Sequence, residues 1–203
     1  MAKTENVSVG NLAAGEVVQS LFSASIEAHQ RFALDGTEKV VAAAEAVSRA
    51  VAGGGKVLAF GNGGSAGDAQ HFVTELVGRF ERQRRAMAAV ALTADSSVLT
   101  AIANDYGYEH VFARQVEALG VAGDVCVGIS TSGRSQNVER ALVAARGLGL
   151  VTIALTGRDG GTIAAHADIV VNVADDSTAR VQEVHLTILH AICALVEQSG
   201  KET

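Results

Sequence analysis

Two short segments carry side chains that could bind a metal ion. In the first, His71 and Glu75 stand four residues apart after a glycine-rich turn, so in a helix they lie on one face. An imidazole and a carboxylate are both ligands that zinc accepts. The same spacing is also typical of an ion pair on a helix surface, so this pair alone does not identify a metal site.

The second segment is RVQEVHLTILHAICALVE, residues 180–197, an apolar helical pattern interrupted by Gln182, His185 and His190. In a helix, Gln182 and His190 are separated by about 12 Å along the axis and about 80° around it. An ion could lie between them only if both side chains reach toward it. Because His185 is about 140° from His190, we expect it to be a core or interface histidine with its own hydrogen-bond partner.

A third segment, STSGRS, has the composition of a phosphate site. Its hydroxyls are Ser130, Thr131, Ser132 and Ser135, and they follow an apolar run and precede a helical pattern. Hydroxyl and backbone N–H donors at a helix N-terminus stabilise a phosphate group. Capping of the helix would account for one hydroxyl but not for four. The P-loop lysine is missing, so the segment does not predict nucleotide hydrolysis.

Two further turns suit a sugar ligand. GNGGS, residues 61–65, would let the backbone approach a ligand at the start of a helix. With Ala66 it also matches a dinucleotide-binding fingerprint, but the acidic residue of that fingerprint is not clearly placed. Asn104 and Asp105, at an expected bend, could hydrogen-bond sugar hydroxyls, although an Asx-capped turn explains them equally simply.

The elements that must position these groups alternate regularly. Apolar runs at 56–60, 86–92, 124–130, 150–156 and 168–173 each end in a polar or glycine-rich turn, and helical stretches separate them. This pattern predicts an α/β fold, a doubly wound five-stranded parallel sheet flanked by helices. Ligands of such folds bind beyond the carboxyl ends of the strands, where the candidate turns occur.

Two additional helices are predicted before the first strand, at about 13–32 and 37–51. With the last helix they are expected to form an oligomeric bundle. No repeat or linker interrupts the chain. We therefore expect one domain over residues 1–203, with N-terminal helices at 12–55 used in oligomerisation and an α/β core at 56–199.

The composition restricts the class of partner. Of the 203 residues, 48% are hydrophobic and 19% are charged, which indicates a globular protein. A net charge of −6 argues against a general nucleic-acid or membrane surface. Cys126 and Cys193 lie in apolar runs and are expected to be core residues in a reducing compartment. No apolar stretch approaches the roughly 18 to 20 residues of a membrane span, so we expect a cytoplasmic protein.

Five motifs closely resemble the sedoheptulose 7-phosphate isomerases (phosphoheptose isomerases) of the sugar isomerase (SIS) domain class. They are GNGGSAGDAQHFVTE, LTAIANDYGYEHVF, GDVCVGISTSGRSQNV, ALTGRDGG and ARVQEVHLTILHAICALVE, in the order of the family. The resemblance covers about residues 12–198. It implies conversion of sedoheptulose 7-phosphate to D-glycero-D-manno-heptose 7-phosphate, the first step toward activated heptoses for lipopolysaccharide core or other glycans.

The family pattern also implies a homotetramer with active sites at subunit interfaces and one Zn²⁺ per subunit. Carried over residue by residue, the zinc ligands are His71, Glu75, Gln182 and His190. The implied substrate contacts are Asn62, Gly63, Gly64, Ser65, Glu75, Asn104, Asp105, Ser130, Thr131, Ser132, Ser135 and Gln182.

Aldose–ketose isomerisation moves a proton between C1 and C2 through an enediol. We expect Glu75 to be the catalytic base and His190 the acid, each role being worth about 10²- to 10⁴-fold. Zinc could polarise the carbonyl or stabilise the enediolate. The segment ERQRRAMAAV departs from the family pattern, since it has none of the prolines found there in many members and is one residue longer. Ala179 stands where some members have an acid.

Two other functions are compatible with the domain. A paralogue of the family binds the bacterial replication initiator, but it lacks the carboxylate at the position of Glu75, the histidine at the position of His190, and the NDYG sequence. This chain has all three, which favours the enzyme. Another phosphosugar isomerase or a sugar-phosphate sensor is the second alternative.

Overall fold

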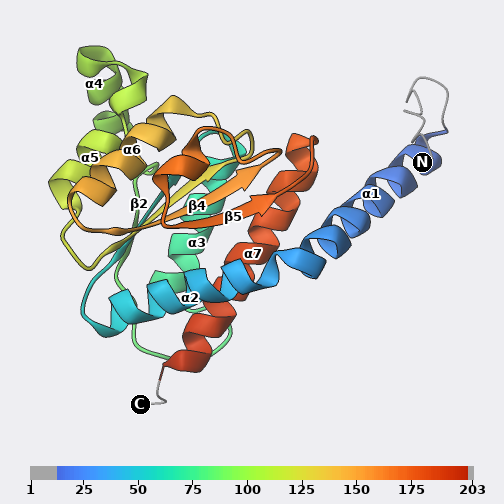
Figure 1. Ribbon diagram of the computed structural model, residues 1–203, viewed down its shortest axis with the longest axis horizontal. Helices are drawn as coiled ribbons and strands as arrows, with labels where there is room; N and C mark the ends of the chain where they lie inside the picture. Colours follow the sequence, from blue (N-terminus) through green and yellow to red (C-terminus); the bar gives the residue numbers. More distant parts are fainter. Residues whose placement is uncertain (1–12, 201–203) are drawn as a thin grey trace.

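The computed structural model describes residues 13–200. Its centre is a five-stranded, wholly parallel sheet with strand order β2-β1-β3-β4-β5 (Figure 1). The strands are β1 (Val57–Gly61), β2 (Ala89–Ala91), β3 (Val125–Ser130), β4 (Val151–Gly157) and β5 (Ile169–Val173). Every residue of β1 and β3 is buried, which is why these strands are continuous apolar runs. The predicted fold class is therefore confirmed.

The second strand is shorter than its apolar run. β2 contains three residues and pairs only with β1, whereas the run predicted a strand over 86–92. Ala86 and Ala88 are exposed and lie in the loop that precedes the strand. Alanine is a poor strand former, so an edge strand made largely of alanine ends where its pairing ends.

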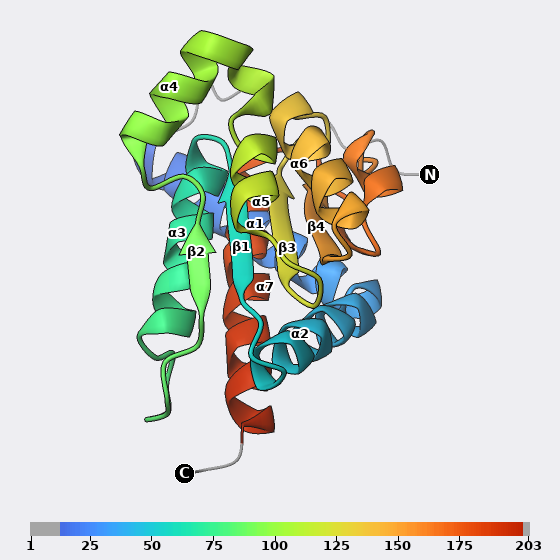
Figure 2. The same ribbon diagram turned by 90° about the vertical axis from the view of Figure 1, so that its left-hand side faces the viewer.

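Helices cover both faces of the sheet. Alternate side chains of a strand point to opposite faces: Val57 and Ala59 of β1 join one buried cluster, and Leu58 and Phe60 join the other. Figure 2 shows α5 and α6 on one side of the strands and α7 on the other. The α-helices are α1 (Ala14–Asp35), α2 (Thr37–Ala52), α3 (Gly64–Val77), α4 (Ser96–Tyr106), α5 (Ala113–Leu119), α6 (Gln136–Gly147) and α7 (Thr178–Ser199).

The two N-terminal helices differ in their packing. α2 buries Val40, Ala44 and Val47 and contacts α7 and β5, so it belongs to the layer that covers the sheet. In α1 only Ala28 is buried, and the helix extends away from the body (Figure 1). The packing therefore does not separate residues 12–55 from the α/β core, because α2 is part of that core. That the N-terminal helices serve in oligomerisation stays a prediction.

The last helix corrects one expectation. By length and composition alone, Thr178–Ser199 is long and apolar enough to cross a membrane, with a mean hydropathy of 1.2. Half of that apolar window is buried inside the protein, and α7 packs against α1, α2 and α3. Its apolar surface is thus explained by its place in the core.

The strand order places the candidate turns together. From β1 the chain continues to β2 on one side and then to β3 on the other, so the connections diverge between β1 and β3. Open α/β sheets bind ligands at such a switch point, beyond the carboxyl ends of the strands. The glycine turn follows β1 and the hydroxyl segment follows β3, as the sequence pattern predicts.

Candidate functional site

The glycine turn allows close packing between α3 and α7. Gly63 has φ 56° and ψ −120°, a backbone conformation that residues with side chains rarely adopt. Gly64 begins α3 directly beneath the amide of Gln182: a Cβ at this position would lie 2.4 Å from Gln182 Nε2. Ser65 is buried in the first turn of the helix. The two glycines therefore let α7 place Gln182 over the start of α3.

Asn62 is held in a fixed orientation by Asn137 and Tyr108, two residues outside the predicted site. Its amide forms a reciprocal pair with that of Asn137, at 2.9 and 2.8 Å. The Tyr108 hydroxyl donates to Asn62 Oδ1 at 3.1 Å. Asn137 is buried and comes two residues after the hydroxyl segment, which is the only signal that could have indicated it. These bonds tie the turn after β1 to the start of α6.

The hydroxyls after β3 face one another. Ser130 Oγ lies 2.9 Å from Ser135 Oγ and 3.3 Å from Ser132 Oγ. Ser135 is the N-cap residue of α6, yet its side chain makes no capping bond. Helix capping, the simple alternative, therefore does not account for these hydroxyls. They form a polar cradle at a helix N-terminus, an arrangement suited to an anion.

The loop that begins with the motif ALTGRDGG, for which the sequence predicts no site residue, supports this cradle. Ile163 N donates to Gly133 O at 3.0 Å. A Cβ on Gly133 would lie 2.2 Å from Gly160 O, and one on Gly157 would lie 2.3 Å from Thr131 O. Only glycines permit backbones this close. The cradle is consequently built within this chain and rests on a second loop.

Three of the four predicted metal ligands converge. His71 Nε2 lies 2.9 Å from His190 Nε2 and 3.4 Å from Glu75 Oε1. His71 and Glu75 come from α3, and His190 comes from α7, 119 positions away from His71. The predicted pairing of the two helices is thus observed. The side chain of His71 is 43% exposed and that of Glu75 is 17% exposed, so this cluster is open to solvent on one side.

The donor set suits zinc chemically, but it is not preformed. Within residues 13–200, no group of three or more His, Cys, Asp or Glu is arranged to hold a metal ion as it stands. A tetrahedral zinc ion about 2.0 to 2.1 Å from two nitrogens would separate them by roughly 3.3 Å. The two Nε2 atoms, now at hydrogen-bond distance, would need to part by a few tenths of an ångström.

Gln182 lies apart from this trio, near the start of α3. Its Nε2 donates to Asp68 Oδ1 at 3.4 Å. Asp68 is buried, and its Oδ2 has no partner among the described residues. Burial raises the pKa of Asp68, although the bond from Gln182 and the nearby His71 oppose this. Asp68 precedes His71 by one helical turn, and the sequence pattern does not indicate it.

His185 is a core histidine, as predicted. It is fully buried, and its Nε2 lies 2.9 Å from the carbonyl oxygen of Thr156. Burial lowers the pKa of His185 to about 4, despite the hydrogen bond to Thr156. The ring is therefore neutral near pH 7 and takes no part in the cluster of His71 and His190.

Asn104 and Asp105 are not brought into the site. They lie in the last turn of α4 rather than at a bend, because the chain turns only at Gly107, where φ is 94°. Asn104 Nδ2 donates to Asp105 Oδ1 at 2.8 Å, and both residues are exposed. Figures 1 and 2 show α4 projecting from the body.

Known proteins resemble the chain in sequence and structure. Residues 22–157 match the SIS domain family. A phosphoheptose isomerase of Geotalea daltonii is 57% identical over 160 residues, which are 79% of this chain and 83% of that protein. The structure of phosphoheptose isomerase from Neisseria gonorrhoeae has 50% identity and a TM-score of 0.87, covering 92% of this chain and 100% of the other. The structure of a phosphoheptose isomerase from Francisella tularensis has 38% identity and a TM-score of 0.89 over the same shares.

Proposed function

Because the chain belongs to the phosphoheptose isomerase family of SIS-domain proteins, we propose that it converts sedoheptulose 7-phosphate to D-glycero-D-manno-heptose 7-phosphate. One observation carries this assignment. The side chains of Glu75 and His190, the proposed base and acid, come from two different helices and lie beside the same imidazole, His71. The same chain also presents a hydroxyl cradle that suits the phosphate of a sugar.

The chemistry divides between these two regions. The hydroxyls of Ser130, Ser132 and Ser135 hold the phosphate at the N-terminus of α6, where the helix dipole favours a negative charge. Glu75 removes a proton from the carbon next to the carbonyl while His190 donates one to the carbonyl oxygen, which gives the enediol. Glu75 then returns its proton to the former carbonyl carbon, and the hydroxyl on the neighbouring carbon gives its proton to His190 as the new carbonyl forms. Each such transfer is worth about 10²- to 10⁴-fold.

A zinc ion is part of this proposal. His71, Glu75 and His190 would hold it, Glu75 through one carboxylate oxygen and His190 through one ring nitrogen, so that the other atom of each stays free for proton transfer. The amide oxygen of Gln182 is the fourth proposed ligand; because Gln182 lies apart from the other three and its Nε2 donates to Asp68, its side chain would have to turn toward the ion. When bound, zinc would supply Lewis-acid polarisation of the substrate carbonyl. The imidazole and carboxylate donors of α3 and α7 are those that zinc prefers, which supports one ion per subunit.

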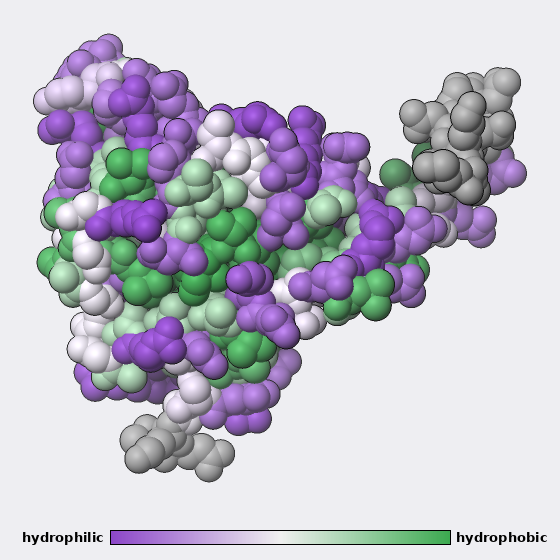
Figure 3. Space-filling view, viewed as in Figure 1, coloured by the Kyte–Doolittle hydropathy of each residue, from purple (hydrophilic) through white to green (hydrophobic). Residues whose placement is uncertain are grey.

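A homotetramer with active sites between subunits is also proposed. α1 exposes Val18, Leu21, Phe22 and Ile26, at 53%, 52%, 69% and 56% of their surface. Hydrophobic residues are visible along this projecting helix in Figure 3. An exposed apolar surface of this kind marks a protein contact. The open cluster around His71 and the outlying Asn104 and Asp105 fit an active site that a second subunit completes.

We place the enzyme in the cytoplasm, where its product would lead to activated heptoses for lipopolysaccharide or another glycan. The test is to incubate the protein with sedoheptulose 7-phosphate and measure the aldose phosphate, with and without a chelator. Conversion that stops on chelation and resumes with Zn²⁺ is expected. No conversion with metal present would favour a sensor or a non-catalytic relative. Conversion that persists after complete metal removal would exclude a role for zinc but would leave the isomerase assignment in place.

A further inference from the structure

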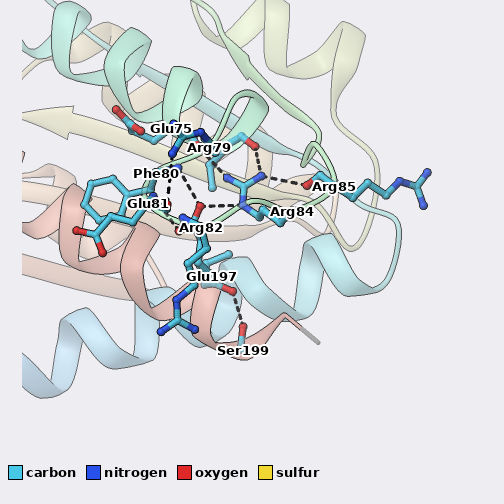
Figure 4. Close-up of polar contacts among 11 residues, drawn as sticks. Glu75, Arg79, Phe80, Glu81, Arg82, Arg84, Arg85, Glu197 and Ser199 are labelled. Atoms are coloured by element: carbon cyan, nitrogen blue, oxygen red, sulfur yellow. Dashed lines mark hydrogen bonds and ion pairs between the residues drawn. The ribbon is translucent and has the colours of Figure 1, made fainter. Parts of the chain in front are cut away.

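The loop between α3 and β2 is held by one buried carboxylate. Residues 78–88, here called the arginine loop, contain Arg79, Arg82, Arg84 and Arg85 and have no helix or strand. This is the segment without prolines that departs from the family pattern. Figure 4 shows its backbone wrapped around Glu197, which comes from the last turn of α7.

Glu197 accepts four hydrogen bonds. Its Oε1 accepts from the Phe80 N–H at 2.8 Å and from Arg84 Nε at 3.0 Å. Its Oε2 accepts from the N–H groups of Glu81 and Arg82, at 3.0 and 2.9 Å. The side chain is only 3% exposed. Burial opposes its charge, but the backbone N–H groups and the Arg84 guanidinium outweigh this effect and hold the pKa of the carboxyl below its ordinary value.

Arg84 extends the contact to the helix that carries the candidate base. Its Nη2 donates to the carbonyl of Glu75 at 2.6 Å, and its Nη1 donates to the carbonyl of Leu76 at 2.9 Å. These carbonyls belong to the last turn of α3, where helix geometry leaves them without partners. Glu197 and Arg84 together therefore fasten the end of α3 to α7.

Phe80 extends the contact to the candidate acid. Its N–H is bound to Glu197, and its ring lies against the ring of His190, with the centroids 5.3 Å apart and the planes at 31°. Glu197 follows His190 by seven residues, two helical turns along the same face of α7. The position of the supporting ring is thus set by the carboxylate.

We propose that Glu197 is a positioning residue for the isomerisation. It sets the location of Glu75 through Arg84 and that of His190 through Phe80, although it touches neither reacting group. Acid and base must be placed at the same time, and a displacement of about 1 Å at a reacting group can cost on the order of 100-fold in rate. This inference rests on the proposed function for its catalytic meaning.

The first test is Glu197→Gln with a matched control. The variant keeps the shape of the side chain but turns an NH₂ group toward N–H donors. We expect kcat/KM to fall by about 10- to 100-fold, the usual loss when a residue supporting a site is changed. Asp124→Asn is the control, because Asp124 is also buried and accepts from two backbone N–H groups and from Lys56 Nζ, but lies before β3, at the far ends of the strands. At equal stability, we expect the control to keep nearly full activity.

The second test does not depend on catalysis. In the purified full-length protein, the ring protons of His190 should show the ring-current shift caused by Phe80, and Glu197→Gln should reduce it. Phe80→Leu, at a partly exposed position, removes the ring without removing the bonds to Glu197. It should abolish the shift and lower kcat/KM. The double variant, Glu197→Gln with Phe80→Leu, should have a kcat/KM no lower than that of the less active single variant.

The outcomes separate the two hypotheses. If wild-type protein does not convert sedoheptulose 7-phosphate, the proposed function fails, and the His190 signal alone decides whether Glu197 positions that ring. Wild-type conversion with unchanged kcat/KM and an unchanged His190 signal in Glu197→Gln would overturn the positioning role. An equal loss in Asp124→Asn would also overturn it, since the effect would then be general destabilisation.

Discussion

The hydroxyl cradle and the cluster on α3 and α7 are assembled in opposite ways. The cradle comes from six consecutive residues, 130–135, whose hydroxyls already face one another and whose backbone rests on a second loop. The cluster joins side chains 119 positions apart, on two helices that a distant carboxylate holds together. A site built from one segment depends on local geometry, whereas a site built from two helices depends on how the helices are fixed. Substitutions in the first region should therefore affect substrate binding, and those in the second should affect the rate of proton transfer.

The largest effect is expected from Glu75→Gln. The amide keeps the size of the side chain but cannot accept a proton, so kcat should fall by about 10²- to 10⁴-fold. Phosphate binding should remain, because the cradle is formed by other residues. Turnover with sedoheptulose 7-phosphate, together with circular dichroism and the elution volume on size exclusion, gives the measurement. Substantial residual turnover in a folded variant would remove Glu75 from the role of base.

His185 separates stability from catalysis on the same helix. Its pKa of about 4 lies below the ordinary value of 6.5, so the unfolded chain binds the proton more readily than the folded one. The stability contributed by the neutral ring is complete above about pH 6.5 and is lost as the pH falls toward 4. When the pH falls from 7 to 5, the free energy of unfolding of the wild-type protein should decrease by about 2 kcal/mol more than that of the His185→Gln variant.

Urea denaturation at the two pH values measures this difference. Because His185 contacts Thr156 and not the cluster, the pH profile of kcat should change little in the variant. Equal pH sensitivity of wild-type and variant unfolding would show that folding does not lower the pKa of this ring.

Ser135→Ala tests the cradle. The change removes the hydroxyl that lies 2.9 Å from Ser130 Oγ, and a hydrogen bond to a charged group is worth about 1.5 to 3 kcal/mol. KM should rise by roughly tenfold or more, with kcat nearly unchanged. Ser48→Ala is the matched control. It removes a hydrogen bond of similar length between two serine hydroxyls, Ser48 and Ser199, which lies on the outer side of α2 and α7. A fall in kcat with an unchanged KM would contradict the division between the two regions.

The sequence predicted these regions to different depths. The five strands and the hydroxyl segment could be identified from their pattern alone, because continuous apolar runs and a cluster of hydroxyls are local properties. For the cluster, the eight-residue gap between Gln182 and His190 made a shared ion difficult to justify by helix geometry, and only the family resemblance linked the two residues to α3. In the structure, His190 joins His71 and Glu75, while Gln182 contacts Asp68 instead.

The supporting residues could not be predicted. Glu197 is an acidic residue near the end of an apolar helix, a position where most carboxylates are solvated. Its partners are mainly backbone N–H groups of an irregular loop. Because almost every residue type has this group, the sequence does not show which N–H groups will bind a carboxylate. Asn104 and Asp105 were expected at a bend, but Gly107 moves the turn to the end of α4.

The smallest effect is expected from Tyr108→Phe, which addresses the connection between the regions. The variant loses only the bond to Asn62 Oδ1, at 3.1 Å, and the reciprocal pair with Asn137 remains. A net hydrogen bond of about 0.5 to 1.5 kcal/mol corresponds to roughly a two- to tenfold decrease in kcat/KM. Tyr106→Phe is the control, because Tyr106 is similarly exposed and contacts Arg114 through the face of its ring. If Tyr108→Phe instead cost more than Ser135→Ala, the orientation of Asn62 in the glycine turn would contribute more to substrate binding than the Ser135 hydroxyl does.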